Sequence, residues 1–434
     1  MTEARYLPSI DLQMSSKAES GSRLFSDFAG SYDIVRFNAS VKTVHLAVAL
    51  PKESPGMSKD RLPRSARLDR MAAGRGLTHD QAYQSCLGEC VELASASFWG
   101  DEAVINATYR DLKGQALHPA SLLLASHAQY IQREQWNAAY GDFDWMPFRF
   151  DEVEPVQWVE ATSPDGIGSA LIPAAYIYLG YFEAGTDKAF AVADCNGCAA
   201  GATLEGATTT AFLELVERDA TALWWYGRHA RPAFDLGSLR GAEALLASLT
   251  GRRRSHCLLD LTTDFGIPVC AAISFEPEGE AVAIGVAAHF DASRAATAAL
   301  TEMLQIELSV EMRKAAHVGG RDAFQFWLDR VTLRTMPHLL PTGQQRNALT
   351  SNRFVGPPTV ENCVRICRDA GLQFLTVDLT RPTIGIPAVR VIVPGMRPIR
   401  GRFGDGRLFD VPIKLGWCKT PLTVENLNTV PLSI

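Results

Sequence analysis

Residues 194–226 read DCNGCAAGATLEGATTTAFLELVERDATALWWY, and this stretch decides the fold. A glycine- and alanine-rich turn over residues 196–201 leads into a long helical pattern. A helix that is apolar nearly all round is a buried helix. Here a polar stripe runs between two apolar flanks; the stripe is Thr210, Glu214, Glu217 and Thr221, and the flanks are Phe212, Leu213, Leu215, Val216, Ala220, Leu223 and Trp224.

Two carboxylates on this helix, Glu214 and Glu217, stand three residues apart in the sequence and therefore share a face. A solvated pair is the common outcome of such spacing, but the apolar flanks favour burial. Buried carboxylates are costly unless a cation or hydrogen-bond donors meet them. The pattern therefore predicts a charged partner for this pair.

The same arrangement occurs earlier in the chain. Residues Gly74-Arg75-Gly76 predict a glycine turn, and the residues after it predict a helix over 80–99. On that helix Ser85 is followed four residues later by Glu89 and three residues after that by Glu92. Because the hydroxyl and the two glutamates have the same spacing in both helices, the sequence indicates an internal repeat of a turn and a helix.

Apolar and alternating segments separate the helices and predict strands. We therefore expect an α+β fold in which helices and sheets form layers. A third helix, over residues 291–314, places Glu302 and Gln305 at the spacing of the two glutamate pairs. The expected strands lie at residues 42–50, 170–182, 189–193, 268–275, 281–288, 373–378 and 388–393, and a further helix is expected at 360–370.

The composition is that of an ordinary soluble globular protein. Of the 434 residues, 47% are hydrophobic and 21% are charged. No apolar run reaches the length of a membrane span, and the N-terminus MTEARYLPSIDLQ lacks the regions of a signal peptide. We therefore expect a cytoplasmic protein without a membrane partner. The net charge of −6 argues against a nucleic-acid partner.

The nine cysteines are expected to be free thiols, because their number is odd and no signal peptide precedes them. Cys195-x-x-Cys198 has the spacing of half a zinc site or of a redox pair. No second Cys-x-x-Cys follows it in the sequence. We therefore do not expect a structural zinc ion.

Four glutamates from two buried helices would offer several hard oxygen ligands. Such ligands suit Mg²⁺ or Ca²⁺ better than zinc, and Mg²⁺ often bridges to phosphate oxygens. The glycine turns and the helix N-termini after them favour negative charge. Since neither turn has P-loop or dinucleotide spacing, we expect a nucleotide site of non-standard design. The alternative is a carboxylate–metal hydrolase; the sequence contains no G-x-S-x-G motif.

Taken together, these motifs resemble those of the YcaO-domain family. Their order and spacing match over roughly residues 65–430, which is more specific than any one motif. The resemblance implies a YcaO fold of repeated helix–sheet units with an ATP site between buried helices. It divides the chain into an N-terminal segment (1–65) and a YcaO domain with a C-terminal tail (66–434). The motifs are Asn196-Gly-Cys-Ala-Ala-Gly, Glu214-Leu-Val-Glu217-Arg218-Asp219-Ala220, Gly74-Arg-Gly with Ser85, Glu89 and Glu92, and the late Val393-Pro-Gly-Met, Arg402-Phe, Arg407-Leu-Phe-Asp-Val-Pro and Leu415-Gly-Trp.

The resemblance also implies cofactors and site residues, since YcaO proteins bind ATP and Mg²⁺. The residues that it assigns to Mg²⁺ are Glu89, Glu92, Glu214 and Glu217, and those that it assigns to the nucleotide are Arg75, Ser85, Asn196 and Arg218. Arg218 would also be the catalytic group, and Arg75 stands where the family usually has a lysine. No nucleophile is expected from the protein, because the peptide supplies the hydroxyl or thiol.

Four positions differ from the usual family pattern: Leu93 replaces a common Arg, Gly206 a second Glu, Thr210 a Gln, and Ala298 the Arg that precedes Glu302. Arg294 lies one turn before Ala298 on the same predicted helix face. We therefore expect Arg294 to bind the nucleotide in place of the missing arginine.

The function that the resemblance implies is cyclodehydration. In azole-forming YcaO proteins a Cys, Ser or Thr side chain attacks the preceding amide, ATP phosphorylates the amide oxygen, and an azoline ring results. The motifs do not distinguish this reaction from thioamide or macroamidine formation. They also do not specify the ring type or the peptide positions. A degenerate YcaO that serves as a binding subunit is a further alternative.

Partner proteins are expected as well. Only about 65 residues precede the domain, which is too few for the fused leader-binding domain of longer azole-forming members. The resemblance therefore predicts a heteromeric synthetase. It would comprise this chain, a leader-binding subunit resembling ubiquitin-activating enzymes, and an FMN-dependent dehydrogenase that carries the flavin. The substrate would be a precursor peptide with a leader.

Overall fold

The protein is described by a computed structural model over residues 28–52, 71–141, 144–182, 188–316, 323–347, 354 and 356–432. The expected boundary between residues 65 and 66 lies outside these ranges. Within them, no helix is long and apolar enough to cross a membrane.

Within the described ranges the strands form three sheets, all with antiparallel pairing. The first has the order β1-β2-β3, the second β10-β9-β8, and the third β4-β5-β11-β12-β7 with β6 paired to β5. The strands are β1 (Tyr32–Asn38), β2 (His45–Pro51), β3 (Ala72–Gly76), β4 (Ile105–Ala107), β5 (Val156–Thr162), β6 (Ser169–Pro173), β7 (Cys198–Ala200), β8 (Ser255–Asp260), β9 (Val269–Phe275), β10 (Ala283–Ala288), β11 (Leu375–Asp378) and β12 (Ala388–Ile392).

Three long helices organise these sheets: α2 (His79–Ala96), α7 (Leu204–Gly227) and α9 (Ala292–Ala316). Each follows a strand in the sequence and packs on it: α2 on β3, α7 on β7 and β12, and α9 on β9 and β10. The shorter α-helices are α3 (Ala120–Leu123), α4 (His127–Ile131), α5 (Arg133–Tyr140), α6 (Ala174–Ile177), α8 (Glu243–Leu249), α10 (Ala323–Arg330), α12 (Val360–Asp369) and α13 (Arg407–Lys414).

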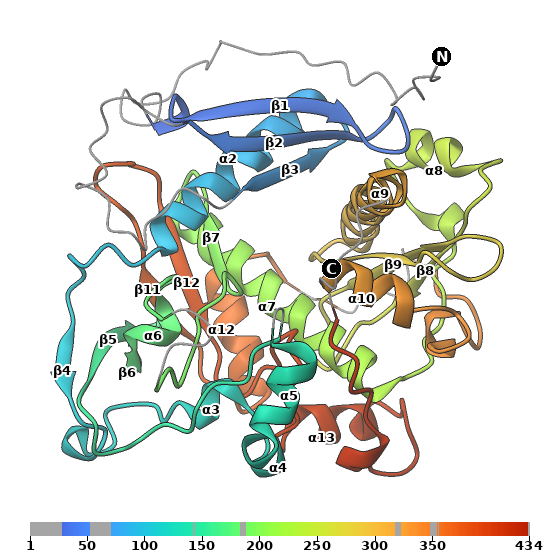
Figure 1. Cartoon of the computed structure of the whole chain (residues 1–434). Coiled ribbons are helices and arrows are strands. Elements are labelled where there is room, and N and C mark those ends of the chain that lie inside the picture. Colours follow the sequence, from blue (N-terminus) through green and yellow to red (C-terminus); the bar gives the residue numbers. More distant parts are fainter. Residues whose placement is uncertain are drawn as a thin grey trace, which may run out of the picture.

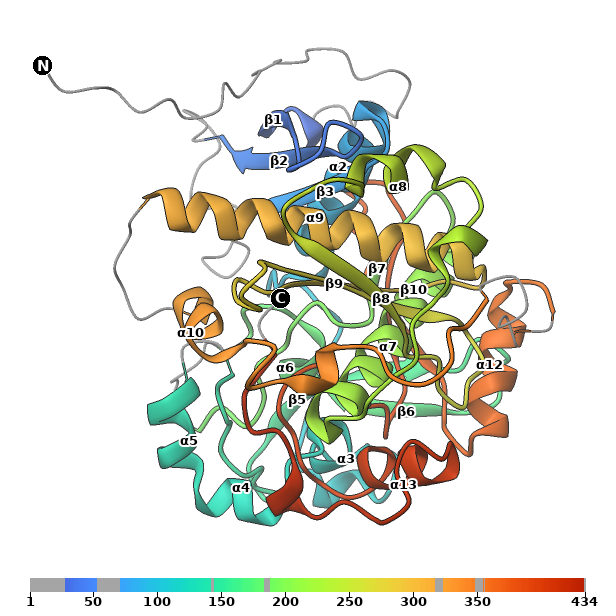
Figure 2. The same cartoon turned by 90° about the vertical axis from the view of Figure 1, so that its right-hand side faces the viewer.

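Each sheet and the long helix that packs on it form one unit, and the three units surround a common centre. Figure 2 shows α9 crossing the molecule between the layer of β1, β2, β3 and α2 above it and the strands β8, β9 and β10 below it. In Figure 1 the helix α7 lies centrally, between the six-stranded sheet and the unit of α9. Helix α9 also contacts β3, and α7 also contacts β10. Each unit therefore joins its neighbours through contacts between a long helix and the strands of another unit.

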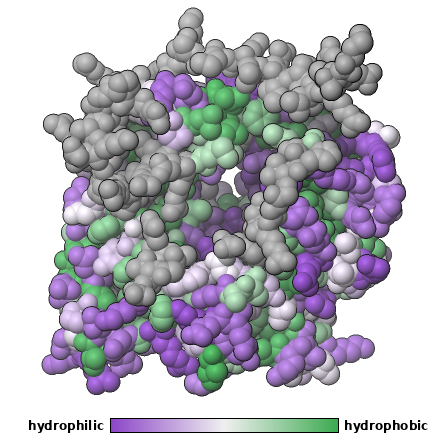
Figure 3. Space-filling model, viewed as in Figure 1, coloured by the Kyte–Doolittle hydropathy of each residue, from purple (hydrophilic) through white to green (hydrophobic). Residues whose placement is uncertain are grey.

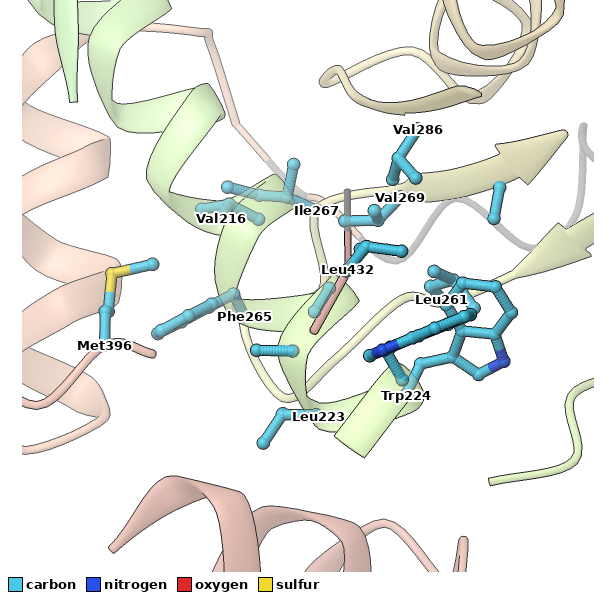
Figure 4. Packing of buried hydrophobic residues seen from close by; sticks show 14 of the residues in the cluster. Val216, Leu223, Trp224, Leu261, Phe265, Ile267, Val269, Val286, Met396 and Leu432 are labelled. Atoms are coloured by element: carbon cyan, nitrogen blue, oxygen red, sulfur yellow. The ribbon is translucent and has the colours of Figure 1, made fainter. Parts of the chain in front are cut away.

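The C-terminal half of α7 is buried on every side, as the sequence predicts. Residues 219–227 are all buried, and Trp224 and Trp225 are fully inside. Figure 4 shows the close packing of Val216, Leu223 and Trp224 among apolar side chains of the second sheet and the C-terminal segments, including Leu261, Ile267, Val286 and Leu432. Burial of this apolar surface is the main stabilising contribution. It fixes α7 as the central element of the fold.

The glycine turn predicted at Gly74-Arg75-Gly76 is wrong, because these residues form the end of strand β3. A Cβ on Gly74 would lie 2.2 Å from both Ala82 O and Cys86 N of α2. Glycine is required here because it allows the strand to approach the helix closely. The turn predicted over residues 196–201 is present at Gly197, whose φ is +77°. Residues 198–200 then form strand β7 and are not part of the turn.

Two strand predictions are also wrong. The segment 170–182 contains β6 but continues as the short helix α6, which begins directly after Pro173. The segment 189–193 is a buried loop rather than a strand. The other expected strands, at 42–50, 268–275, 281–288, 373–378 and 388–393, and the helix at 360–370 are present with small shifts of their ends.

Replacing Gly74 by Ala is expected to destabilise the protein, because the new methyl group must displace helix backbone. Overpacking of this kind costs about 1–3 kcal/mol. Gly88, in the middle of α2, is the matched control, since a Cβ there meets nothing within 4 Å. Gly88→Ala should raise the free energy of unfolding by roughly 0.5–1 kcal/mol. Urea unfolding of both variants measures the difference, and equal effects would contradict the packing argument.

Candidate functional site

The first glutamate of each repeat is fixed by a backbone N–H of the strand or turn that its helix packs on. Ala73 N donates to Glu89 Oε2 at 3.1 Å, and Gly197 N donates to Glu214 Oε2 at 3.1 Å. The third helix has the same contact, because Val286 N donates to Glu302 Oε2 at 2.7 Å. The three units therefore present three equivalent carboxylates toward the centre of the molecule.

Two arginines lie among these carboxylates. Arg218 Nη2 lies 3.4 Å from Glu214 Oε1, and Arg218 Nη1 lies 3.2 Å from Glu217 Oε1. Arg75 Nη2 lies 3.3 Å from Glu302 Oε1 and so joins β3 to α9. The charged partner predicted for the pair on α7 is therefore Arg218, from the same helix.

Burial disfavours the ionised form of four glutamates at the junction, the place where α2, α7 and α9 bring their carboxylates together. Burial raises the pKa of Glu217 to about 8, with Glu302 and Glu214 adding to the effect against the opposing charge of Arg218. Burial, together with the neighbouring Glu214 and Glu89, raises the pKa of Glu92 well above its usual value. Burial also raises the pKa values of Glu89 and Glu214. These carboxyls therefore favour the neutral form unless a cation is bound beside them.

The junction opens into a cavity of about 1000 Å³, which we call the glutamate cleft. Its volume lies at the upper end of the range for small-molecule sites. The molecular surface is hollowed near its centre, and hydrophilic side chains line the opening (Figure 3). The residues lining the glutamate cleft include Arg75, Thr203, Gly206, Thr210, Glu214, Glu217, His289, Arg294, Ala298 and Phe354.

The residues predicted to bind the nucleotide do not all lie in the same cavity. Arg75, Arg218 and Arg294 come to the junction: Arg75 and Arg294 line the glutamate cleft, and Arg218 pairs with its glutamates. Ser85 is exposed on α2, one turn before Glu89. Asn196 lines a second cavity, together with Arg218. The nucleotide roles of all five residues remain predictions.

Three of the four departures from the usual motif pattern, Gly206, Thr210 and Ala298, line the glutamate cleft. Arg294, expected to act for Ala298, lines it as well. Its backbone N–H donates to Asp291 at the start of α9, and its side chain is exposed. Three of the four changes in sequence therefore line one cavity, two of them from α7 and one from α9.

Glu302 is the site residue that sequence reasoning missed. It faces Arg75 and contributes to raising the pKa of Glu217. The available signal was the third helix with Glu302 and Gln305 at the repeated spacing. Gln305 Oε1 is buried and has no hydrogen-bond partner among the described residues. The repeat therefore supplies a fifth carboxylate and an unused amide oxygen.

The donor set fits a hard cation. Five glutamates lie near three arginines at the junction, Arg75, Arg218 and Arg390, so a further cation would favour the ionised carboxylates, which are the ligands that Mg²⁺ prefers. Among the residues that the structure describes, no three His, Cys, Asp or Glu side chains are arranged as a finished metal site. The carboxylates are turned toward Arg218, Arg75 and backbone N–H groups, so metal binding requires some of them to reorient.

The cysteines do not form a metal or disulfide site. All nine are free, and Arg390 Nη1 contacts Cys198 Sγ at 3.5 Å. Burial raises the pKa of Cys198 to about 12 and that of Cys195 well above its usual value. These thiols are therefore poor nucleophiles and poor metal ligands.

The geometry agrees with comparisons to known proteins. A sequence model of the YcaO family, described as an ATP- and Mg²⁺-binding cyclodehydratase, matches residues 73–397. The structure is similar to that of a heterocyclase in complex with substrate and cofactor, with a TM-score of 0.82, 36% identity, and coverage of 92% of this chain and 54% of that one. The α+β layered fold expected from the sequence is therefore confirmed.

Two further structures resemble the chain. The heterocyclase TruD has a TM-score of 0.71 and 36% identity, with coverage of 83% of this chain and 51% of that one. YcaO from Methanopyrus kandleri bound with AMPPCP and Mg²⁺ shares the fold, with a TM-score of 0.60, 22% identity, and coverage of 86% and 87%. The chain spans about half the length of the two heterocyclases.

Proposed function

This chain belongs to the YcaO cyclodehydratase family, and from that premise we propose that it is an ATP-dependent peptide cyclodehydratase. It would convert Ser, Thr or Cys residues of a ribosomal precursor peptide into oxazoline or thiazoline rings. ATP and Mg²⁺ are its cofactors, as the sequence predicts.

One observation supports the proposal most strongly: carboxylates from three helices converge beside a cavity large enough for a nucleotide. Glu214 and Glu217 line that cavity, and Arg75 and Arg294 line it as well. Phosphate binding needs such cations, while Mg²⁺ needs the carboxylates. Both kinds of group are present around one space.

When bound, ATP supplies the phosphoryl group that lets the amide oxygen leave as phosphate, so that peptide and ATP give azoline peptide, ADP and phosphate. The protein does not need a nucleophile of its own. It must position the peptide and the phosphates and neutralise their charge. The buried, mutually repelling glutamates and the arginines between them are suited to that task.

We assign the metal to Glu89, Glu92, Glu214 and Glu217, and we add Glu302 because its environment is equivalent to that of Glu89 and Glu214. We assign the phosphates to Arg75, Arg218 and Arg294. Arg218 is the candidate catalytic group, because it pairs with Glu214 and Glu217 and also lines the neighbouring cavity.

We further propose that the chain works with two partners. They are a leader-binding subunit resembling ubiquitin-activating enzymes and an FMN-dependent dehydrogenase that oxidises azoline to azole. The support is the resemblance to azole-forming YcaO proteins. Ring formation in the presence of the leader-binding subunit and its loss when that subunit is omitted would be the expected result.

The test is an assay of the chain with ATP, Mg²⁺, a leader-bearing precursor peptide rich in Gly-Cys and Gly-Ser, and the leader-binding subunit. We expect peptide-dependent ADP release and the loss of one water from the peptide for each ring, measured by mass spectrometry. Oxygen-to-sulfur exchange in the peptide would identify thioamide formation instead. Absence of turnover, or turnover and ring formation that Glu214→Ala/Glu217→Ala leaves unchanged, would identify a binding subunit.

A further inference from the structure

An ion pair joins two units of the protein beside the glutamate cleft. Arg75 stands on β3 and Glu302 on α9, and Arg75 Nη2 lies 3.3 Å from Glu302 Oε1. Arg75 also lines the cleft. The proposed function gives each member of this pair a different partner, because Arg75 is assigned to the phosphates and Glu302 to the metal.

The pair uses the oxygen of Glu302 that a metal would need. Val286 N holds Oε2 at 2.7 Å, so Oε1 is left to face a ligand, and Arg75 lies beside it. Glu214 repeats this arrangement, because Gly197 N holds its Oε2 and the arginine one turn later on α7 lies 3.4 Å from its Oε1. In both helices an arginine therefore lies at the oxygen that the backbone does not hold.

The contact between Arg75 and Glu302 is looser than a structural ion pair of the same protein. Arg407 Nη2 lies 2.7 Å from Oδ2 of the fully buried Asp219, which is the distance of a strong charge-assisted hydrogen bond. The side chains of Arg75 and Glu302 are 31% and 18% exposed. Partly exposed pairs at a longer distance contribute little to stability, so this contact costs little to break.

Arg75 also lies near the glutamates of the other two helices. Burial raises the pKa values of Glu89 and Glu217, and the charge of Arg75 opposes both rises. Because Glu89 is on α2, Glu217 on α7 and Glu302 on α9, one guanidinium acts on carboxylates from all three helices. Arg75 therefore supplies positive charge where Mg²⁺ is expected to supply it.

We propose that Arg75 is an exchangeable cation: it pairs with Glu302 until Mg²⁺ and nucleotide bind, and its guanidinium then turns from this carboxylate to the phosphates. The inference rests on the proposed function and adds a coupling between its two cofactors. No covalent bond changes in the exchange. Glu302 replaces one cation by another and Arg75 replaces one anion by another, so neither group is left as an unpaired charge.

The exchange makes the binding of each cofactor depend on the other. Once Glu302 holds the metal, Arg75 is free for phosphate, and once Arg75 holds phosphate, Glu302 is free for the metal. Such coupling is reciprocal, so each cofactor strengthens the binding of the other by the same factor. An arginine suits this task because its five donors and its permanent charge serve a carboxylate and a phosphate alike.

The test removes the arginine and measures metal binding without nucleotide. The probe is Mn²⁺, which takes the same oxygen ligands as Mg²⁺ and whose free fraction is read by electron paramagnetic resonance with the whole chain. Arg75→Gln should bind Mn²⁺ about two- to fivefold more tightly than wild type, because the competing cation is gone. It should bind AMPPCP more weakly when no metal is present.

Arg294→Gln is the matched control for charge. Arg294 also lines the glutamate cleft, but its side chain is exposed and forms no ion pair with a carboxylate in the part of the chain that the structure describes. It should weaken AMPPCP binding and leave the binding of Mn²⁺ alone unchanged. An equal gain of Mn²⁺ binding in Arg75→Gln and Arg294→Gln would show general charge repulsion and overturn the inference.

Glu302→Gln should change both affinities in the opposite direction. Its carboxamide oxygen can still accept from Val286 N, but it carries no charge to hold Arg75. Mn²⁺ binding should therefore weaken, and metal-free binding of AMPPCP should strengthen. Because a misfolded variant cannot gain affinity, the two gains do not depend on equal stability. Unchanged or weaker Mn²⁺ binding by Arg75→Gln, or no gain of AMPPCP binding by Glu302→Gln, would refute the exchange.

Ring formation is scored separately, in the assay of the proposed function. If wild type forms rings while the affinities do not follow this pattern, the exchange is wrong and the proposed function stands. If the affinities follow the pattern and wild type forms no rings, the exchange stands and the cyclodehydratase assignment fails.

Discussion

Glu217→Gln is expected to reduce peptide-dependent ATP turnover by about 10²–10³-fold, which corresponds to several kcal/mol of lost charge stabilisation. The side chain of Glu217 is 14% exposed, pairs with Arg218 and lines the glutamate cleft. The amide keeps the volume but cannot ionise to bind Mg²⁺. We therefore expect normal folding and weak binding of AMPPCP, with a binding constant that no longer responds to Mg²⁺.

Glu160→Gln is the matched control, because Glu160 lies exposed on β5, away from the junction. It should turn over ATP as wild type does. Calorimetric titration with AMPPCP at several Mg²⁺ concentrations distinguishes a loss of metal binding from a loss of nucleotide binding. A Glu217→Gln protein with wild-type turnover would contradict the assignment of this carboxylate to the metal.

Asp219→Ala is expected to lower the free energy of unfolding by about 3–5 kcal/mol, the largest stability effect that the structure predicts. Asp219 is fully buried and follows Arg218 directly on α7. It accepts from Arg407 Nη2 at 2.7 Å and from the backbone N of Arg397 at 2.9 Å. Without it, Arg407 loses its fully buried partner, and the loop after β12 loses an anchor.

Asp264→Ala provides the comparison. Asp264 also pairs with Arg407, at 2.7 Å, but its removal leaves the contact between Arg407 and Asp219 intact. The loss of stability in urea unfolding should therefore be clearly smaller than for Asp219→Ala. Equal losses from the two substitutions would contradict the view that Asp219 is the principal anchor between α7 and the C-terminal loop.

Local patterns in the sequence were sufficient to predict the helices that carry the site. A helical pattern in which apolar residues flank a narrow polar stripe predicts a buried helix, and α7 is such a helix. Repetition of Glu-x-x-Glu predicts that Glu89 and Glu214 are equivalent, and each accepts a backbone N–H from its own strand or turn. Glu302 was missed because the partial repeat Glu302-x-x-Gln305 was given less weight than the two complete pairs.

Other features depend on contacts between distant residues and could not be read from local patterns. Gly74 was assigned to a turn because glycine is common in turns, whereas its role is close packing on α2. The second cavity brings together α7, the turn before β7 and residues 390–402. The late arginines have no helical or strand period in the sequence, so only the folded chain shows that Arg390 and Arg400 pair with Asp194.

The most direct measurement follows the amide oxygen. A precursor peptide is prepared with oxygen-18 in the backbone carbonyl that precedes the target Cys, and it is incubated with the chain, its leader-binding partner, ATP and Mg²⁺. If the glutamate cleft delivers phosphate to the amide oxygen, the label appears in inorganic phosphate as rings form, and Glu217→Gln abolishes this transfer. Ring formation with the label in water, or ATP turnover with the label retained in the peptide, would contradict amide activation by this site.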